Sequence, residues 1–152
     1  MRERVTSLPA LSCLCATLRR VSRALTQLYE QELRPLGMRV TQLTILQVLS
    51  RAGDLTQGKL GELLSLDSTT LTRTLKIMVR QGWIAERRGK DRRERLLRLS
   101  KSGYAQVARI LPVWREMQAR LRRQLGEQTW ENLPRLTDQV TNVVAAQGVW
   151  SW

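Results

Sequence analysis

The hydrophobic period of this chain changes near residue 83, and that change restricts the folds open to it. Up to residue 79 the apolar side chains recur at steps of three and four, which is the spacing of amphipathic helices. Residues 83–87 and 95–99 are instead short strand-like runs on either side of a basic segment that contains Gly89. The sequence therefore predicts a mainly α fold with one small β-hairpin.

Hydroxyl residues and helix breakers mark the expected helix boundaries. The first helix covers residues 8–34 and ends at Pro35 and Gly37. Helix N-caps are expected at four hydroxyl residues, namely Thr41, Thr56, Ser68 and Ser100. Pro112 is expected to kink or split the helix that follows the hairpin, and a last helix begins near Gln128. Two short helices joined by a tight turn therefore stand directly before the hairpin.

That order of elements is typical of a winged helix-turn-helix, which residues 41–103 would form as one lobe. In this arrangement the second short helix enters the major groove of DNA, which is about 12 Å wide and admits one helix. Its exposed side is expected to offer hydroxyl and basic groups to bases and phosphates, from Ser68, Thr69, Thr70, Thr72, Arg73 and Lys76. The alternative is a solvated helix face that is merely rich in threonine.

The tip of the hairpin is strongly basic. Residues 87–98 hold seven arginine or lysine residues against Asp91 and Glu94, and such a local excess of charge repels itself unless a counter-charge is present. Arginine inserted into a narrow minor groove is one such arrangement, so DNA contacts are expected from Arg88, Lys90, Arg92 and Arg93. Asp91 is expected to pair with an arginine and hold the loop in shape. The alternative is a loop kept soluble by its charge.

Both ends of the chain carry apolar stripes that a small lobe cannot cover. The stripes lie in residues 8–34 and 104–147, and pairing two copies across a two-fold axis buries both. Such a homodimer places two recognition helices about one DNA turn, ~34 Å, apart. Terminal helices folded back on their own chain are the alternative.

Composition indicates a polyanionic partner and argues against an enzyme. Of 152 residues, 26 are lysine or arginine and 13 are acidic, which gives a formal net charge of +13. That charge favours nucleic acid first and an anionic membrane second. Histidine is absent and cysteine occurs twice, so no catalytic residue, metal site or cofactor is expected.

No leader or membrane segment is expected. A helical stripe runs from Leu8 through Leu18 without the break that a signal-peptide cleavage site needs. No run approaches the ~20 apolar residues of a membrane-spanning helix. We therefore expect a cytoplasmic protein that binds double-stranded DNA and no membrane.

A non-specific nucleic-acid or RNA-binding protein is the competing function. Such proteins stack bases on exposed aromatic side chains. This chain has no phenylalanine and two tyrosines. The sequence therefore favours duplex DNA read by a helix.

Several segments together follow a known pattern. They are residues 60–66, residues 68–73, the Gly82-Trp83-Ile84 exit, and above all Asp91-Arg92-Arg93 followed by Leu99-Ser100-Lys101-Ser102-Gly103. In these residues the chain resembles MarR-type transcriptional regulators, whose pattern is D-x-R, five residues, then L-(T/S)-x-x-G. The resemblance implies a homodimeric repressor on a palindromic operator, with Arg93 in the minor groove and Asp91 positioning the wing.

The resemblance also implies a sensor, for which two interpretations stay open. One is a small aromatic or phenolic ligand, and the other is a cysteine oxidised by peroxide. Cys15 and Tyr29 stand where the thiol-based, OhrR-like branch carries its reactive cysteine and a nearby tyrosine, whereas Arg19 and Val40 replace further tyrosines. A disulfide between Cys13 and Cys15 is not expected, because residues two apart on a helix point about 200° apart. Two cysteines with a purely packing role are the alternative.

Overall fold

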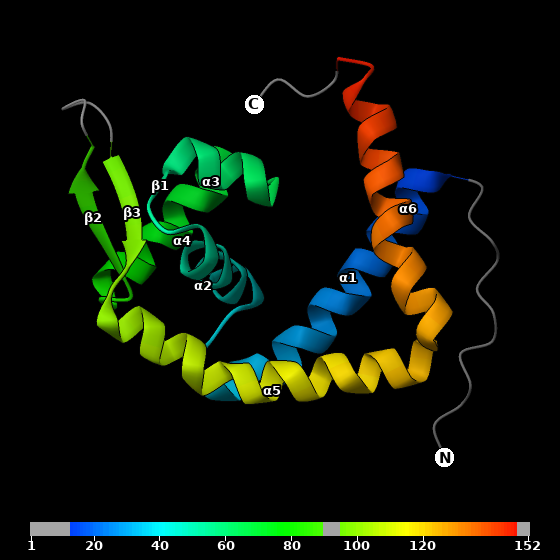
Figure 1. The fold of residues 1–152 in the computed structure, drawn as a ribbon, viewed down its shortest axis with the longest axis horizontal. Helices are drawn as coiled ribbons and strands as arrows, with labels where there is room; N and C mark the ends of the chain where they lie inside the picture. Colours follow the sequence, from blue (N-terminus) through cyan, green and yellow to red (C-terminus); the bar gives the residue numbers. More distant parts are fainter. Residues whose placement is uncertain (1–12, 90–94, 149–152) are drawn as a thin grey trace. The chain divides into compact units, whose positions relative to one another are not determined.

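The computed structural model describes residues 13–89 and 95–148, and the chain divides into two compact units, residues 1–40 and 41–152. The first unit contains α1 (Leu14–Leu33) and the 3-10 helix η1 (Arg34–Leu36), and α2 (Val40–Ala52) begins at its end (Figure 1). The second unit continues with β1 (Leu55–Thr56), α3 (Gln57–Leu64), α4 (Ser68–Arg80), β2 (Ile84–Arg88), β3 (Arg95–Leu99), α5 (Lys101–Leu125) and α6 (Glu127–Ala145). The described fold is mainly α with a small sheet, as predicted.

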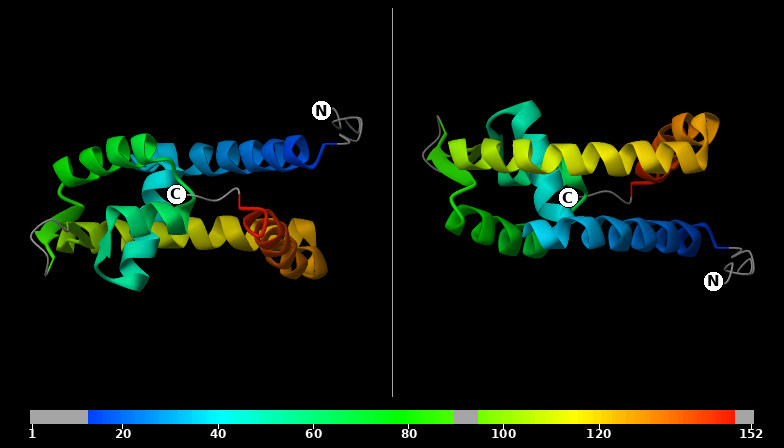
Figure 2. Two further views of the ribbon diagram at one scale, coloured as in Figure 1. Left: turned by 90° about the horizontal axis from the view of Figure 1, so that it is seen from above. Right: turned by 90° about the horizontal axis from the view of Figure 1, so that it is seen from below.

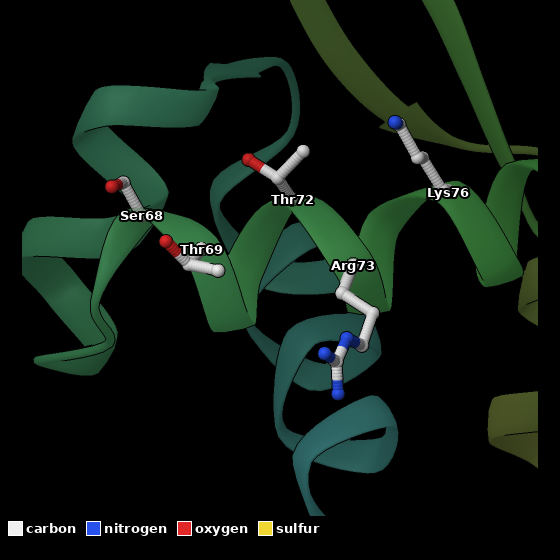
Figure 3. A pocket seen from close by; sticks show the side chains of 5 residues that line it. All are labelled: Ser68, Thr69, Thr72, Arg73 and Lys76. Atoms are coloured by element: carbon white, nitrogen blue, oxygen red, sulfur yellow. The ribbon is translucent and has the colours of Figure 1, made fainter.

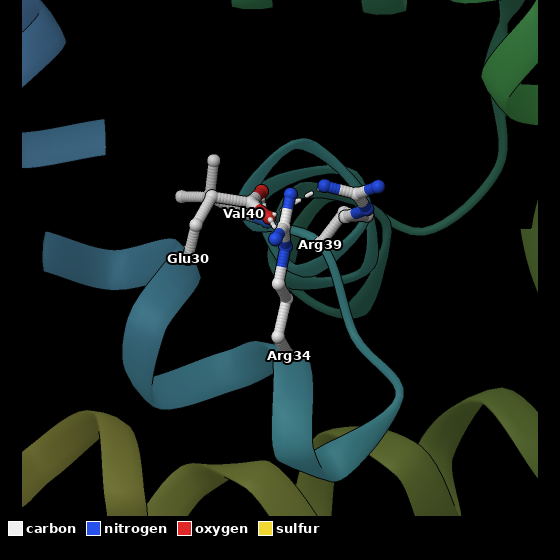
Figure 4. A network of polar contacts seen from close by, with 4 residues as sticks. All are labelled: Glu30, Arg34, Arg39 and Val40. Atoms are coloured by element: carbon white, nitrogen blue, oxygen red, sulfur yellow. Dashed lines mark hydrogen bonds and ion pairs between the residues drawn. The ribbon is translucent and has the colours of Figure 1, made fainter. Parts of the chain in front are cut away.

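The Glu30 carboxylate organises the end of the first unit (Figure 4). Its Oε1 accepts a hydrogen bond from the Val40 backbone N–H at 3.0 Å, and its Oε2 accepts one from Arg39 Nη1 at 2.9 Å. Arg34 adds an ion pair at 3.7 Å. Burial tends to raise the pKa of Glu30, but these partners outweigh burial and hold the pKa below its ordinary value. The expectation that Thr41 caps this helix is wrong, because α2 begins at Val40 and a distant carboxylate satisfies its first N–H.

Side-chain caps define the starts of α3 and α4. Thr56 caps α3 as predicted, and its hydroxyl accepts a hydrogen bond from the Lys59 backbone N–H at 3.2 Å. The cap of α4 is Asp67, whose Oδ1 accepts from the Thr70 backbone N–H at 2.8 Å, so the expected Ser68 cap is wrong by one residue. Hydrogen bonds from Thr70 lower the pKa of Asp67. A carboxylate also suits the positive end of the helix dipole.

The predicted hairpin is confirmed, and a third strand joins it. β2 and β3 pair antiparallel, with Ile84 opposite Leu99 at the base and Arg88 opposite Arg95 toward the tip. β1 pairs with the other edge of β3, which gives the strand order β1-β3-β2. Sequence analysis missed β1 because two residues are too few to show an alternating pattern.

The main core lies in the second unit. Its fully or almost fully buried apolar side chains are Leu43, Ile45, Leu46, Leu49, Leu60, Leu71, Leu75, Met78, Trp83, Ile84, Leu97, Leu99, Ile110 and Met117. They come from α2 to α5, from the sheet and, in the case of Trp83, from the turn before β2. Among the leucines of α3, Leu60 is fully buried, whereas Leu63 is 54% exposed.

The second unit ends in two long helices, of which α5 contributes Ile110 and Met117 to this core. α5 leads from the sheet to α6 as one continuous helix (Figures 1 and 2), so Pro112, which is exposed, does not split it. A proline has no N–H to donate to the carbonyl oxygen four residues earlier in the helix. Because Pro112 is on the solvent side, water can reach that oxygen, and the helix tolerates the proline. α6 contains no buried residue in the described chain.

Candidate nucleic-acid interface

One face of α4 gathers five of the six helix residues that the sequence predicts as DNA contacts. A depression of about 430 Å³ is lined by Ser68, Thr69, Thr72, Arg73 and Lys76 (Figure 3). Thr72 is half-buried and the other four are exposed. Thr70 does not line the depression, because a helical step of about 100° per residue turns it off this face. The face therefore combines three hydroxyls and two cations.

Packing on the opposite side fixes the direction of this face. Leu71, Leu75 and Met78 are each at most 3% exposed, and burying a side chain of this size contributes ~1.5–3 kcal/mol. Rotating α4 about its axis would expose all three together. The polar face is therefore held outward by the core.

A contact that sequence analysis missed joins α3 to α4. Gln57 Nε2 donates a hydrogen bond to Thr72 Oγ1 at 2.8 Å. The two residues lie on different helices, so no local pattern predicts their meeting. This hydrogen bond joins Thr72, one of the predicted DNA contacts, to the preceding helix. It therefore holds the Thr72 hydroxyl in one orientation.

The hairpin formed by β2 and β3, which we call the wing, carries an unfavourable pair of like charges. Arg88 and Arg95 stand directly opposite each other on β2 and β3, and both are exposed. Like charges in that position destabilise a sheet, and Glu86 offsets this only weakly, with its Oε2 3.9 Å from Arg95 Nη1. An anion placed at this end of the hairpin would relieve the repulsion. The other predicted wing residues, Lys90, Asp91, Arg92 and Arg93, lie outside the described residues and stay predictions.

The base of the wing is fixed at a single joint. Ser100 caps α5 as predicted, and its Oγ accepts from the Gly103 backbone N–H at 3.0 Å. The same hydroxyl donates to the Gly82 carbonyl oxygen at 2.5 Å, and the Ser100 N–H donates to Trp83 O at 3.0 Å. A Cβ on Gly103 would overlap the Trp83 carbonyl oxygen. The L-S-x-x-G segment therefore holds the end of α4, the hairpin and the start of α5 together.

The candidate sensor residues lie on α1 or just before it. Cys13 precedes the helix with extended backbone (φ −95°, ψ 116°), so the argument against a Cys13–Cys15 disulfide from helical geometry is wrong in its premise. Both thiols are free and exposed, and Arg19 Nη2 lies 3.8 Å from Cys15 Sγ. Tyr29 lies about 21 Å further along α1, at 1.5 Å per residue. Tyr29 and Cys15 of the same α1 helix are therefore too far apart to be in contact.

Comparison with known proteins supplies the family. The sequence pattern of the MarR family matches residues 38–94, which run from before α2 into the wing. The structure of the M. tuberculosis transcriptional regulator MosR in complex with DNA is similar, with a TM-score of 0.73 and 33% identity over 90% of this chain and 97% of that chain. This chain belongs to the MarR family. Members of the MarR family are DNA-binding transcriptional regulators and not enzymes.

Two curated relatives from Bacillus subtilis (strain 168) match the chain over part of their length. The HTH-type transcriptional regulator YwoH is 32% identical over 80 residues, and an organic hydroperoxide resistance transcriptional regulator is 40% identical over 91 residues. The matches cover 53% and 59% of this chain. They span 58% and 62% of the relatives' own lengths, which is less than two thirds.

Two further findings concern membrane-spanning helices and metal sites. Within residues 13–89 and 95–148, no helix combines the length and apolar character needed to cross a membrane. The same described residues contain no group of three cysteine, aspartate or glutamate side chains placed to hold a metal ion.

Proposed function

We propose that this chain is a sequence-specific, double-stranded DNA-binding repressor that acts as a homodimer on a palindromic operator. The observation that carries the proposal is the face of α4, where two cations and three hydroxyls are held outward by a buried apolar face. A groove about 12 Å wide admits one such helix. Membership of the MarR family, whose relative MosR has been crystallised with DNA, supports the same function.

The two cations of α4 have different expected roles. Arg73 can donate two hydrogen bonds to the O6 and N7 edge of a guanine, which distinguishes that base from the others. Lys76 offers a single point charge, which suits a phosphate. The hydroxyls of Ser68 and Thr69 are short enough to let the helix approach the bases closely. Arg88 and Arg95 then give the wing a second, electrostatic contact with the backbone.

Homodimerisation is supported by the apolar side chains that α1 and α6 leave exposed. These are Leu14, Leu18 and Val21 on α1, and Leu133, Leu136 and Val143 on α6. On each helix they are spaced so that they lie along one face, and an exposed apolar helix face suits an interface with another chain. A second copy supplies a matching surface by two-fold symmetry.

Binding to matched and scrambled duplexes tests the DNA-binding proposal. The full chain is titrated at physiological salt against a palindromic operator, the same bases in scrambled order, and an RNA of equal length. The proposal expects binding at least ~10³-fold tighter to the operator, the usual gap between specific and non-specific sites. Equal affinity for all three would support a non-specific nucleic-acid binder instead.

Release by an oxidant is the second candidate function, for which Cys15 is the observation. Its sulfur is exposed, so a peroxide can reach it from solvent, and it lies 3.8 Å from Arg19 Nη2. Attack of the thiol sulfur on the terminal oxygen of an organic hydroperoxide forms an S–O bond and breaks the O–O bond. The sulfur becomes a sulfenic acid, and the thiol proton passes to the leaving alkoxide, which departs as an alcohol. The 40% identity to an organic hydroperoxide resistance regulator supports this candidate.

Operator release distinguishes the two sensors. The protein–operator complex is titrated in parallel with a phenolic acid and with an organic hydroperoxide. Cys15→Ser should abolish release by the hydroperoxide, whereas Cys13→Ser, the neighbouring matched variant, should keep at least part of it. If the phenolic acid releases the unchanged protein and both cysteine variants equally, the result favours the aromatic effector. A hydroperoxide response that survives Cys15→Ser would contradict the thiol candidate.

A further inference from the structure

An ion pair connects the two outer edges of the sheet. Arg87, on β2, donates from Nε to Asp54 Oδ2 at 2.5 Å, and its Nη2 reaches the same oxygen. Asp54 lies in the turn between α2 and β1. Because the strand order is β1-β3-β2, β1 and β2 are not neighbours. The pair therefore spans β3, and we call it the sheet brace.

The brace lies outside the hydrophobic core. Along β2 the side chain of Ile84 is buried, and strand alternation puts Arg87 on the opposite face. The Arg87 side chain is 54% exposed and that of Asp54 is 28% exposed. Removing either charge would therefore cost little global stability, because exposed ion pairs contribute little.

We propose that Arg87 is a positioning residue for DNA binding, and that it acts through Asp54 by holding the wing at a fixed angle to the lobe. The joint at Ser100 fixes the base of the hairpin, where β2 begins and β3 ends, and pairing with β1 attaches β3 at Leu96 and Leu97. β2 is the strand that β1 does not pair with, and Arg87 lies one residue from its tip end. The contact of Arg87 with Asp54 therefore attaches the outer strand of the hairpin to the lobe near the tip.

A positioning role and a direct phosphate contact predict opposite changes in DNA affinity when the neighbouring acid is neutralised. A free arginine would contact a phosphate directly, and neutralising a nearby acid would then strengthen DNA binding. The proposed brace, in contrast, requires the Asp54 carboxylate as the partner of Arg87. Neutralising Asp54 should therefore weaken binding to a polyanion even though it raises the formal net charge of +13 by one.

The test compares Asp54→Asn with Glu116→Gln in the full chain. Glu116 is an exposed acid on α5 that pairs with Arg123 at 3.4 Å, so the second variant makes the same charge change at a pair of similar kind. Asp54→Asn should weaken operator binding by about three- to tenfold, the range expected from one exposed ion pair in each of two subunits. Glu116→Gln should leave binding unchanged or slightly tighter.

Three additional measurements separate positioning from a structural role. The thermal midpoint of Asp54→Asn should match that of the unchanged protein, while hydrogen exchange of the β2 amides without DNA becomes faster. Arg87→Lys should also weaken binding, because lysine keeps the charge but loses the planar fork. The double variant Asp54→Arg with Arg87→Asp should recover affinity to within about twofold of the unchanged protein.

The brace is refuted if Asp54→Asn binds as tightly as the unchanged protein or more tightly. Loss of affinity together with a lower thermal midpoint and no recovery in the charge-swapped double variant would also overturn it. The affinity arm rests on the proposed DNA-binding function, but the hydrogen-exchange arm does not. An unchanged protein that fails to bind any operator therefore contradicts the function, and unchanged β2 exchange in Asp54→Asn contradicts the brace.

Discussion

α4 and α6 are both amphipathic helices of the second unit, but they use their apolar faces differently. α4 buries Leu71, Leu75 and Met78 within its own chain. α6 buries none of its residues in the described structure, and Leu136 and Val143 are 57% and 56% exposed. The difference teaches that the apolar face of α4 orients a polar surface, whereas that of α6 is itself available as a surface.

The largest expected effect is on stability, from truncating one leucine on each helix. Leu75→Ala should lower the free energy of unfolding by ~2–5 kcal/mol, because it leaves a cavity in a packed core. Leu136→Ala should change it by less than ~0.5 kcal/mol when measured at a concentration where subunits are dissociated. Chemical denaturation with a shared slope measures both. Equal losses would break the contrast between the two helices.

A charge placed on the exposed apolar face of α6 should affect assembly instead. Leu136→Asp should raise the dimer dissociation constant about 30-fold or more, the effect of losing an interface contact worth ~2 kcal/mol. Asn142→Asp, on the polar side of α6, makes the same kind of change and should have little effect. Sedimentation velocity over a dilution series measures both variants. A dimer insensitive to Leu136→Asp would place the interface elsewhere.

The exposed face of α4 should control base discrimination. Arg73→Ala should reduce preference at one position of each half-site by ~1–3 kcal/mol if its guanidinium reads a base. Lys76→Ala should weaken all sequences alike and lower the salt slope by about one. Competition binding with single-base operator variants at several salt concentrations measures these effects. A uniform loss in Arg73→Ala would assign that residue to the backbone.

The smallest expected effect concerns the polar contacts of Glu30 in the first unit. These contacts stabilise the first unit, whereas apolar packing stabilises the region around α4. The lowered pKa of Glu30 means that its carboxylate contributes stability above its ordinary pKa of 4.5, and that this contribution is lost as the pH falls through the folded-state value. Glu30→Gln should therefore cost ~1 kcal/mol at pH 7. Urea unfolding between pH 3 and 7 should show the two proteins converging in acid. A constant difference across that range would contradict the assignment.

Sequence reasoning succeeded where the pattern was local and periodic. The buried faces of α2 and α4, the two strands of the wing, and the caps at Thr56 and Ser100 all follow from spacing within a few residues. The same spacing grouped the hydroxyl and basic residues of α4, apart from Thr70. These features depend on helical and strand geometry alone, so a single sequence contains them.

Contacts between distant segments were beyond that reasoning. Glu30 caps α2, Gln57 holds Thr72, and Asp54 meets Arg87, and in each case the partners lie on separate elements. The cap of α4 was missed for a different reason, since Asp67 and Ser68 are both good N-caps and the pattern does not choose between neighbours. Tertiary packing decides the three contacts between distant segments, and β1 forms by pairing with the distant strand β3.

Selection of bound duplexes from a random DNA pool by the full chain tests the central claim most directly. The account predicts enrichment of a two-fold symmetric sequence whose half-sites lie about one helical turn, 10–10.5 base pairs, apart. It also predicts that Arg73→Ala relaxes the same position in both half-sites. Recovery of sequences without symmetry, or no enrichment at physiological salt, would contradict it.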